Sequence, residues 1–348
     1  MMSEINLNEI NNELKKSCPE KNQYYFGHGK ILLSGEYFVL DGAQSLALPT
    51  KVGQSLAVTY SHSFSPTLSW KSFDVQGNCW FDSKFEFWHF KCLDEKPTEE
   101  ALFLQKILQQ VRKQNTHFLR DDVDVKVETR LGFPICWGLG SSSSLIYNIA
   151  QWAYISPFEL LFKTHGGSGY DIACAQSEGP IVYKKTSSGP NWSPLSFDPI
   201  FKDNLYFVYL GKKQNSREAV KDYSKKRPFQ SSLIAKITEL TQEFINAKNL
   251  IQFQNAISEH EKIVAENLDM TPVKELLFND FNGAVKSLGA WGGDFVLVAS
   301  DDDFSSIKNY FNSKGLNVIY RYNDLIAAPL ETMSRESIKV NLTSNLIH

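Results

Sequence analysis

The sequence predicts an α+β protein of two domains, and three observations lead to this prediction. The chain has 348 residues, whereas single domains are usually roughly 100–200 residues long. Its second half alternates short apolar runs with helical patterns, as layered α+β structures do. Between the halves, residues 187–199 hold three prolines together with Ser, Gly and Asn, which is typical of a linker. We therefore expect a polar lead-in over residues 1–22, an N-terminal domain over 23–186 and a C-terminal domain over 187–348.

The first half is expected to contain strands separated by helices. The apolar run from Lys30 is closed by Asp41-Gly42, a turn signal that favours a hairpin. Residues 98–117 carry an apolar stripe at helical spacing, and 123–129 alternate valine with charged or polar residues as a half-buried strand does. In chain order we expect strands and turns over 24–60, edge strands over 61–90, a helix over 98–117, a strand over 123–129, a helix over 145–155, a short helix from Ser156-Pro157 and a strand over 179–185.

The second half is expected to alternate the two kinds of element. Its strands are short apolar runs, and its helices show wider apolar periodicity. In chain order we expect a strand over 205–210, one or two long helices over 231–264, a helix over 272–288, a strand over 294–300, a helix over 304–313 and a strand over 316–321.

Composition excludes several classes of protein. The 36 Lys and Arg residues nearly balance the 39 Asp and Glu residues, giving a formal net charge of -3. No global positive field would attract nucleic acid or an anionic membrane. The five cysteines form no CxxC pair, which argues against a zinc site or redox dithiol. We expect a cytoplasmic protein, a monomer or a homodimer, without nucleic-acid or membrane partners; a small anionic ligand remains compatible with a local basic pocket.

A run of glycine and serine is the strongest local signal for chemistry. Gly138-Leu-Gly140 precedes four serines and an apolar helix, so backbone N–H groups and the positive end of the helix dipole would meet at one point. The alternative is a flexible turn with a serine N-cap. The run is not a Walker loop, because no Gly-Lys-Ser/Thr follows. The candidate phosphate-binding residues are Gly138, Leu139, Gly140, Ser141, Ser142 and Ser143.

Residues 134–144 resemble the central motif of the GHMP kinases, a family that includes galactokinase, homoserine kinase, mevalonate kinase and phosphomevalonate kinase. Residues 29–42 resemble the opening motif of the family, with a Gly-Glu-Tyr form most like phosphomevalonate kinase. Residues 286–294 resemble its C-terminal glycine loop, although Trp291 stands where the family usually has Gly. Taken alone, the first of these two segments could be an edge hairpin and the second a simple glycine turn. The loop residues are Gly289, Ala290, Gly292, Gly293 and Asp294.

The resemblance implies a fold and a set of catalytic groups. An N-terminal α/β domain and a C-terminal ferredoxin-like α+β domain would bind ATP and the acceptor between them. Ser168-Gly-Tyr-Asp171 resembles the segment that holds the catalytic aspartate of the family, and Lys30 would be the cation beside it. From local sequence alone, Asp171 is equally a helix-capping or turn residue. For Mg²⁺ the resemblance indicates Ser142, with Glu159 as a second candidate, although a solvated glutamate on a helix face fits Glu159 as well.

The function implied by this resemblance is ATP- and Mg²⁺-dependent phosphoryl transfer to a small acceptor. Mevalonate or phosphomevalonate, in isoprenoid precursor synthesis, is favoured within the family. A galactose-type or homoserine-type kinase is the enzymatic alternative, and an inactive nucleotide-binding regulator is the alternative from another class. The candidate acceptor-binding residues are Glu36, Tyr37, Ser168, Gly169, Ser216 and Arg217.

Overall fold

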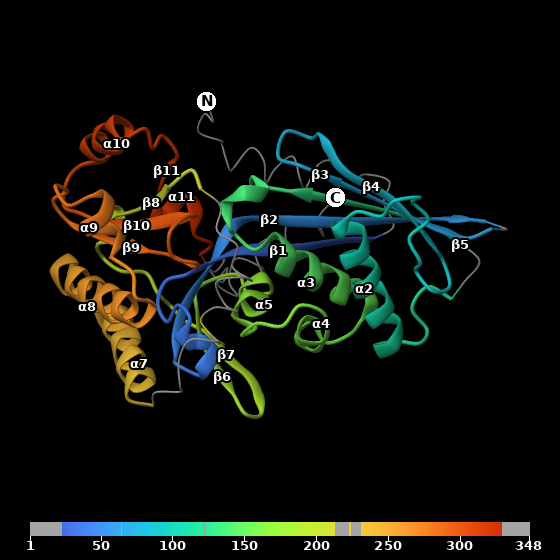
Figure 1. The fold of residues 1–348 in the computed structure, drawn as a ribbon, viewed down its shortest axis with the longest axis horizontal. Coiled ribbons are helices and arrows are strands. Elements are labelled where there is room, and N and C mark those ends of the chain that lie inside the picture. The colour runs from blue at the N-terminus through green and yellow to red at the C-terminus, as the bar shows by residue number, and fades with distance from the viewer. Residues whose placement is uncertain (1–22, 64, 121–122, 213–222, 224–230, 329–348) are drawn as a thin grey trace, which may run out of the picture.

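The computed structural model describes residues 23–63, 65–120, 123–212, 223 and 231–328. The molecule is elongated, with a long sheet and its helices at one end and a smaller sheet with its own helices at the other (Figure 1). No described helix is long and apolar enough to cross a membrane. The expected lead-in over residues 1–22 lies outside the described residues.

The larger sheet provides the scaffold for the first two motifs. Its hydrogen-bonded order is β4-β3-β5-β2-β6-β7, and β1 also pairs with β2. The β3–β5 pair is parallel, and the other neighbouring strands are antiparallel. The strands are β1 (Gln23–Leu32), β2 (Ser45–His62), β3 (Thr67–Phe73), β4 (Cys79–Glu86), β5 (Val123–Leu131), β6 (Ile181–Thr186) and β7 (Gly189–Pro194).

Helices cover one face of this sheet, as Figure 1 shows. They are α2 (Glu99–Gln114), α3 (Ser141–Ala153), α4 (Pro157–Thr164) and α5 (Tyr170–Ala175), with the 3-10 turn η2 (Ile135–Trp137) before α3. The Thr98 side chain caps α2 by accepting from the Ala101 amide. Ser156 caps α4 in the same way, with a proline in the first turn. These caps satisfy amides that have no partner inside the helix, so the predicted helix starts are confirmed.

The smaller sheet has four strands within the described residues, in the order β11-β8-β10-β9, with every neighbouring pair antiparallel. Together with α7, α8 and α10 it follows the βαββαβ order of a ferredoxin-like unit. The elements are η3 (Lys202–Asn204), β8 (Leu205–Tyr209), α7 (Ser231–Asn246), α8 (Leu250–Leu268), α9 (Val273–Leu277), β9 (Ala284–Ser287), β10 (Phe295–Ala299), α10 (Phe304–Ser313), β11 (Ile319–Arg321) and α11 (Tyr322–Leu325).

The helix predicted over 272–288 is wrong in its second half. Helix α9 ends at Leu277, and residues 284–287 form the fully buried strand β9, which pairs with β10. Gly283 has φ of 139°, a conformation that interrupts a helix and suits glycine. Pairing with a buried neighbouring strand therefore decides the structure here over the helical pattern.

The linker predicted over 187–199 is wrong where a strand occupies it, and the hairpin predicted from Lys30 to Gly42 is confirmed in its strand pairing but not in the position of its turn. Strand β7 lies within that linker and pairs with β6 at the edge of the larger sheet, where prolines are tolerated. After β1 ends at Leu32, the chain passes through the 3-10 turn η1 (Phe38–Asp41) before β2 begins. Strands β1 and β2 still pair with each other, so the connection between them is a long loop that can reach the smaller sheet.

One apolar cluster joins the two sheets. It contains Ile31 and Leu48 from the larger sheet, Phe207 and Leu297 from the smaller sheet, and Phe253 from α8, all of them buried. Burying apolar surface is the main favourable contribution to folding, so this cluster fixes the two sheets against each other. The motifs of the sequence analysis lie around this junction.

Candidate active site

Lys30 lies on β1 where that strand meets the glycine–serine turn. Its backbone N–H donates to the carbonyl of Leu139 at 2.9 Å. A Cβ added to Gly140 would lie 3.0 Å from Cγ of Lys30, so the lysine side chain runs directly over this glycine. The first and second motifs are therefore adjacent, as the resemblance implied, and only glycine at position 140 leaves room for the lysine.

The glycine–serine turn opens helix α3. Gly138 and Gly140 have φ of 67° and 91°, which glycine adopts without strain. The Ser143 hydroxyl is turned inward and donates to the Gly140 carbonyl at 2.9 Å. Ser141 and Ser142 are partly exposed at the start of the helix. The first amides of α3 begin at this turn, where a helix N-terminus favours an anion, whereas the side chain of Leu139 is buried in the core.

Asp171 lies in the first turn of α5, beside the lysine. The helix begins after Gly169, which has φ of 96°. The Tyr183 hydroxyl donates to the carbonyl of Ser168, and an added Cβ on Gly169 would lie 3.0 Å from that hydroxyl oxygen. Ser168 and Gly169 are buried and fix the start of the helix, which is a structural contribution rather than the acceptor contact expected from the sequence. Asp171 itself accepts from the Ile172 amide at 3.2 Å.

The electrostatics of Lys30 and Asp171 are coupled. Burial lowers the pKa of Lys30, but the Tyr170 hydroxyl, Asp171 and Asp294 together outweigh burial, so the pKa of Lys30 is raised and the side chain stays cationic. Burial raises the pKa of Asp171, and Lys30 opposes that rise. A charged lysine that interacts electrostatically with a carboxylate of raised pKa gives the site one group that can neutralise developing charge and another that can accept a proton.

Tyr170 is a functional candidate that the sequence analysis missed. Lys30 Nζ lies 5.6 Å from the centroid of the Tyr170 ring, and the Tyr170 hydroxyl accepts a hydrogen bond from the lysine. Tyr170 stands at the variable position of the Ser-Gly-x-Asp segment, so the motif did not mark it. Its hydroxyl restricts where the ammonium group can point.

Replacing Tyr170 by Phe is expected to lower kcat about tenfold, because the cation keeps the ring but loses one hydrogen bond to a charged group. Steady-state kinetics with whichever acceptor the enzyme turns over would measure the change. Tyr154→Phe is the control, because that ring is 84% exposed. Equal kcat values for the Tyr170 variant and the wild type would show that the hydroxyl does not position Lys30.

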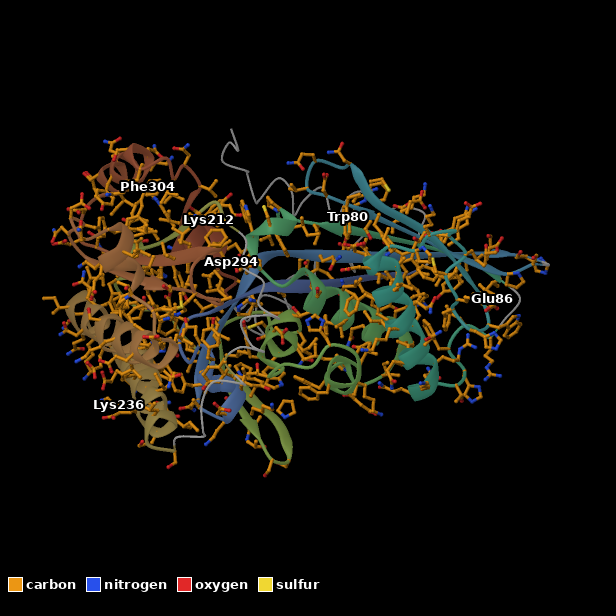
Figure 2. All side chains as sticks on the ribbon, viewed as in Figure 1. Trp80, Glu86, Lys212, Lys236, Asp294 and Phe304 are labelled. Carbon is orange, nitrogen blue, oxygen red and sulfur yellow. The ribbon has the colours of Figure 1, made fainter. Side chains whose placement is uncertain are left out.

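The C-terminal glycine loop brings Asp294 to the same place. The Asp294 amide donates to the carbonyl of Lys212 at 2.7 Å, and its carbonyl accepts from Leu210 at 2.8 Å. A Cβ added to Gly138 would overlap the Asp294 carboxyl group. Figure 2 shows Asp294 and Lys212 close together at the junction of the two sheets. The third motif therefore meets the second through direct contact of Asp294 with Gly138.

No family model matches the sequence, and no curated protein matches it. Among solved structures, the mevalonate kinase of Methanococcus jannaschii superposes with a TM-score of 0.65 at 14% identity, over 87% of this chain and 98% of that chain. The phosphomevalonate kinase of Streptococcus pneumoniae, in complex with phosphomevalonate and AMPPNP, superposes with a TM-score of 0.63 at 16% identity, over 86% and 99%. The galactokinase of Lactococcus lactis, in complex with galactose, superposes with a TM-score of 0.58 at 13% identity, over 90% and 97%.

The chain has the GHMP kinase fold. The fold covers both sheets, because the matches extend over most of this chain and nearly all of each neighbour. The expected architecture, an N-terminal α/β part followed by a ferredoxin-like α+β part, is thereby confirmed.

Trp291, the departure from the expected glycine loop, has a structural explanation within the GHMP kinase fold. Its side chain is buried against Phe38, Ala43 and residues of α7 and α8. Its backbone N–H donates to the Tyr37 hydroxyl. The indole therefore packs into the junction of the two parts, while Gly289 and Gly292 keep positive φ values on either side of it.

Glu36, predicted to bind the acceptor, is buried in the GHMP kinase fold and pairs with residues of the smaller part. Its carboxylate contacts the Lys286 ammonium, and Oε2 lies 3.3 Å from Nε2 of His260. Glu36 is 1% exposed, so the pairing takes the place of the expected acceptor contact. Tyr37 is partly buried, and the centroid of its ring lies 5.3 Å from that of Tyr223, with the two ring planes tilted by 38°. Ser216 and Arg217 lie outside the described residues.

Glu261 completes this buried group and predicts a pH dependence of stability. Burial raises the pKa of Glu261 from 4.5 to about 8, and Lys286, whose Nζ lies 3.9 Å from Oε1, opposes the rise. The pKa of Glu261 is higher in the folded protein than in the unfolded chain, so protonation of Glu261 stabilises the fold. This contribution to stability is complete below pH 4.5 and is lost as the pH rises to about 8. In Glu261→Gln this decline should be smaller. Thermal unfolding across the interval would measure it.

The control for this pH dependence is Glu259→Gln, an exposed residue on the same helix. That variant should keep the slope of the wild type. If Glu261→Gln and the wild type lost stability with the same slope, Glu261 would be ionised in the folded protein, and the predicted pH dependence would be wrong.

Magnesium would need ligands from a bound phosphate in this site. Among the described residues, no group of three or more His, Cys, Asp or Glu side chains could hold a metal ion. Ser142 lies in the first turn of α3, and Mg²⁺ commonly takes one or two protein ligands together with substrate phosphates. Glu159 is exposed on α4 and paired with Lys163 at 2.5 Å, so it belongs to a solvated helix face and we do not propose it as a ligand.

Proposed function

We propose that this chain is an ATP-dependent small-molecule kinase of the GHMP type. The observation that supports this best is the position of Lys30. Its side chain covers Gly140 of the phosphate-binding turn, and its charge interacts with both Asp171 and Asp294. Lys30 belongs to the first motif, and it thus interacts with residues of the second motif, the third motif and the aspartate segment. Such a convergence of a cation with a phosphate-binding turn and carboxylates suits phosphoryl transfer.

The start of α3 would hold the phosphate chain of ATP. Free amides and the helix dipole favour negative charge there, and Ser141 and Ser142 add hydroxyl donors. Mg²⁺ would supply charge neutralisation on the phosphate oxygens, with Ser142 as its candidate protein ligand. Lys30 approaches the same turn from β1 and would neutralise charge that develops on the transferring group.

Asp171 would act on the acceptor. Its raised pKa makes the carboxylate a better base, so it can accept the proton of an attacking hydroxyl while Lys30 limits the charge that builds up. For an acceptor that is itself a phosphate, the attacking oxygen is already ionised near neutral pH. In that case Asp171 and Lys30 contribute positioning and charge neutralisation rather than proton transfer.

Mevalonate or phosphomevalonate is the acceptor that we propose, which places the enzyme in cytoplasmic isoprenoid precursor synthesis. The Gly-Glu-Tyr and Gly-Gly-Asp details of the sequence favour phosphomevalonate, and one structural neighbour was solved with phosphomevalonate and AMPPNP. A galactose-type kinase is the second candidate, because the Lactococcus lactis galactokinase covers 90% of this chain.

The decisive experiment measures ADP release with ATP, Mg²⁺ and each of mevalonate, phosphomevalonate, galactose and homoserine. A preparation made in the same way from host cells that lack this protein shows whether any activity comes from a contaminant. Acceptor-dependent turnover with mevalonate or phosphomevalonate supports the proposal. Turnover with galactose or homoserine alone would show that the chain is a GHMP-type kinase with a different acceptor from the one proposed. ATP binding without any turnover would instead make it a nucleotide-binding regulator.

A further inference from the structure

A second group of ionisable side chains lies away from the phosphate turn, inside the junction of the two parts. We call Glu36, His260, Glu261 and Lys286 the buried network. They come from the loop after β1, from α8 and from β9, and none is more than 3% exposed. Burying charge is costly unless the groups are paired, so a network on three separate elements needs a physical reason.

His260 is the member whose protonation the geometry defines. The Gly35 amide donates to Nε2 of His260 at 3.0 Å, so this nitrogen is an acceptor and carries no proton. The ring is therefore neutral with its proton on Nδ1. Burial and the charge of Lys286 lower the pKa of His260 well below its ordinary value, which agrees with this assignment. A proton on Nε2 would oppose the Gly35 N–H and break the hydrogen bond.

The bond from Gly35 fixes a turn in which only glycine fits. Gly35 has φ of 88°, and a Cβ there would overlap the Ser45 side chain. Next to it, the Ser34 hydroxyl lies 2.9 Å from the Thr241 hydroxyl on α7. Tyr37 also has a positive φ, of 63°. The loop after β1 is thus held by hydrogen bonds to α7 and α8 in addition to those that Ser34 makes with Leu46 on β2.

Lys286 connects the same loop to the C-terminal glycine loop. Its ammonium contacts Glu36 and donates to the carbonyl of Ser287 at 3.0 Å. Ser287 ends β9, and the glycine loop with Asp294 follows immediately. Glu36 is six residues beyond Lys30 in the chain. The buried network therefore lies between the segment that carries Lys30 and the segment that carries Asp294.

We propose that His260 is a positioning residue: by accepting the Gly35 amide, it sets the loop after β1, and because Glu36 follows Gly35 in the chain and contacts Lys286, the same bond sets the spacing between Lys30 and Asp294. This inference rests on the proposed kinase function, because the spacing matters for phosphoryl transfer. His260 touches neither Lys30 nor the phosphate turn. Its effect reaches the reacting groups through the backbone of the two glycine-containing segments.

The test compares two substitutions of His260. Gln has a side-chain carbonyl that can accept the Gly35 amide, whereas Leu has a similar size and no acceptor. In His260→Leu we expect kcat to fall about tenfold with KM for ATP within about twofold, because small misplacements cost mainly the transition state. In His260→Gln we expect kcat to return to within about threefold of the wild type.

The control is Phe244→Leu. The Phe244 ring on α7 lies 5.8 Å from the His260 ring and makes no polar contact with it, so this change weakens the same core without removing the hydrogen bond. We expect it to lower the melting temperature and to leave kcat unchanged. If Phe244→Leu and His260→Leu lowered kcat equally, or if Gln failed to rescue kcat, His260 would be a purely structural residue.

A readout without turnover separates this inference from the proposed function. Hydrogen exchange of the peptides that cover residues 33–37 and 286–294 should rise together in His260→Leu and not in Phe244→Leu. If the wild type turned over no acceptor, the kinase proposal would fail, while coupled exchange would still support the buried network as the connection. Exchange that rose only at residues 33–37 would overturn the connection, whatever the activity.

Discussion

Replacing Asp171 by Asn is expected to lower kcat by about a thousandfold, the loss typical of removing a general base or its charge at a phosphoryl-transfer site. Asn keeps the volume of the side chain and can still accept the Ile172 amide, so α5 should remain folded. Loss of the carboxylate also leaves Lys30 with one fewer counter-charge. Steady-state kinetics would give kcat, and calorimetric titration with ATP would show whether nucleotide binding survives.

The matched control for this substitution is Asp82→Asn. Asp82 pairs with Lys71 at 3.1 Å on the surface of the larger sheet, and both side chains are half exposed. Such pairs contribute little, so stability and kcat should stay close to the wild type. Full activity in Asp171→Asn would remove Asp171 from the mechanism. Loss of ATP binding together with activity would make it a nucleotide contact.

Replacing Gly138 by Ala is expected to lower kcat about a hundredfold, because the new methyl group must displace Asp294. The residue has φ of 67°, so Ala also adds backbone strain of about 1 kcal/mol. Displacing Asp294 moves the C-terminal loop away from the glycine–serine turn. Kinetics together with thermal unfolding would separate the two contributions.

Gly77→Ala controls for the backbone strain. Gly77 has φ of 84° and nothing within 4 Å of an added Cβ, so Ala there carries the strain without the displacement. It should lower the melting temperature about as much as Gly138→Ala and leave kcat unchanged. If both variants kept full activity, direct contact between Gly138 and Asp294 would be irrelevant to catalysis.

Many helices and strands of the fold could be predicted from local sequence. The stripe in 98–117 and the alternation in 123–129 predicted α2 and β5, because helix and strand periods are local properties. The predicted helix over 272–288 is wrong at β9, whose sequence Ala-Val-Lys-Ser carries no strand pattern of its own. There the hydrogen bonds to β10 decide, and no window around the strand contains that partner.

The residues of the site also divide into those with a local sequence pattern and those without one. Lys30, Gly140, Asp171 and Asp294 could be selected because each lies in a short recognisable segment. The partners of Glu36 could not, because His260 and Lys286 lie 224 and 250 residues further along the chain. From sequence alone, a glutamate in a turn cannot be distinguished from a surface residue or a binding residue. Burial of an ionisable group is a property of the assembled junction and leaves no local pattern.

The apolar cluster that joins the two sheets has a consequence for how the protein comes apart. Residues of β1, β2, β8, β10 and α8 share this cluster, so neither sheet keeps its own complete interior when the other is lost. Cutting the chain after Pro194 would leave Ile31 and Leu48 facing water on one fragment and Phe207 and Leu297 on the other. Two sheets that look like separable domains therefore behave as a single cooperative folding unit, and neither half is expected to be stable when produced alone.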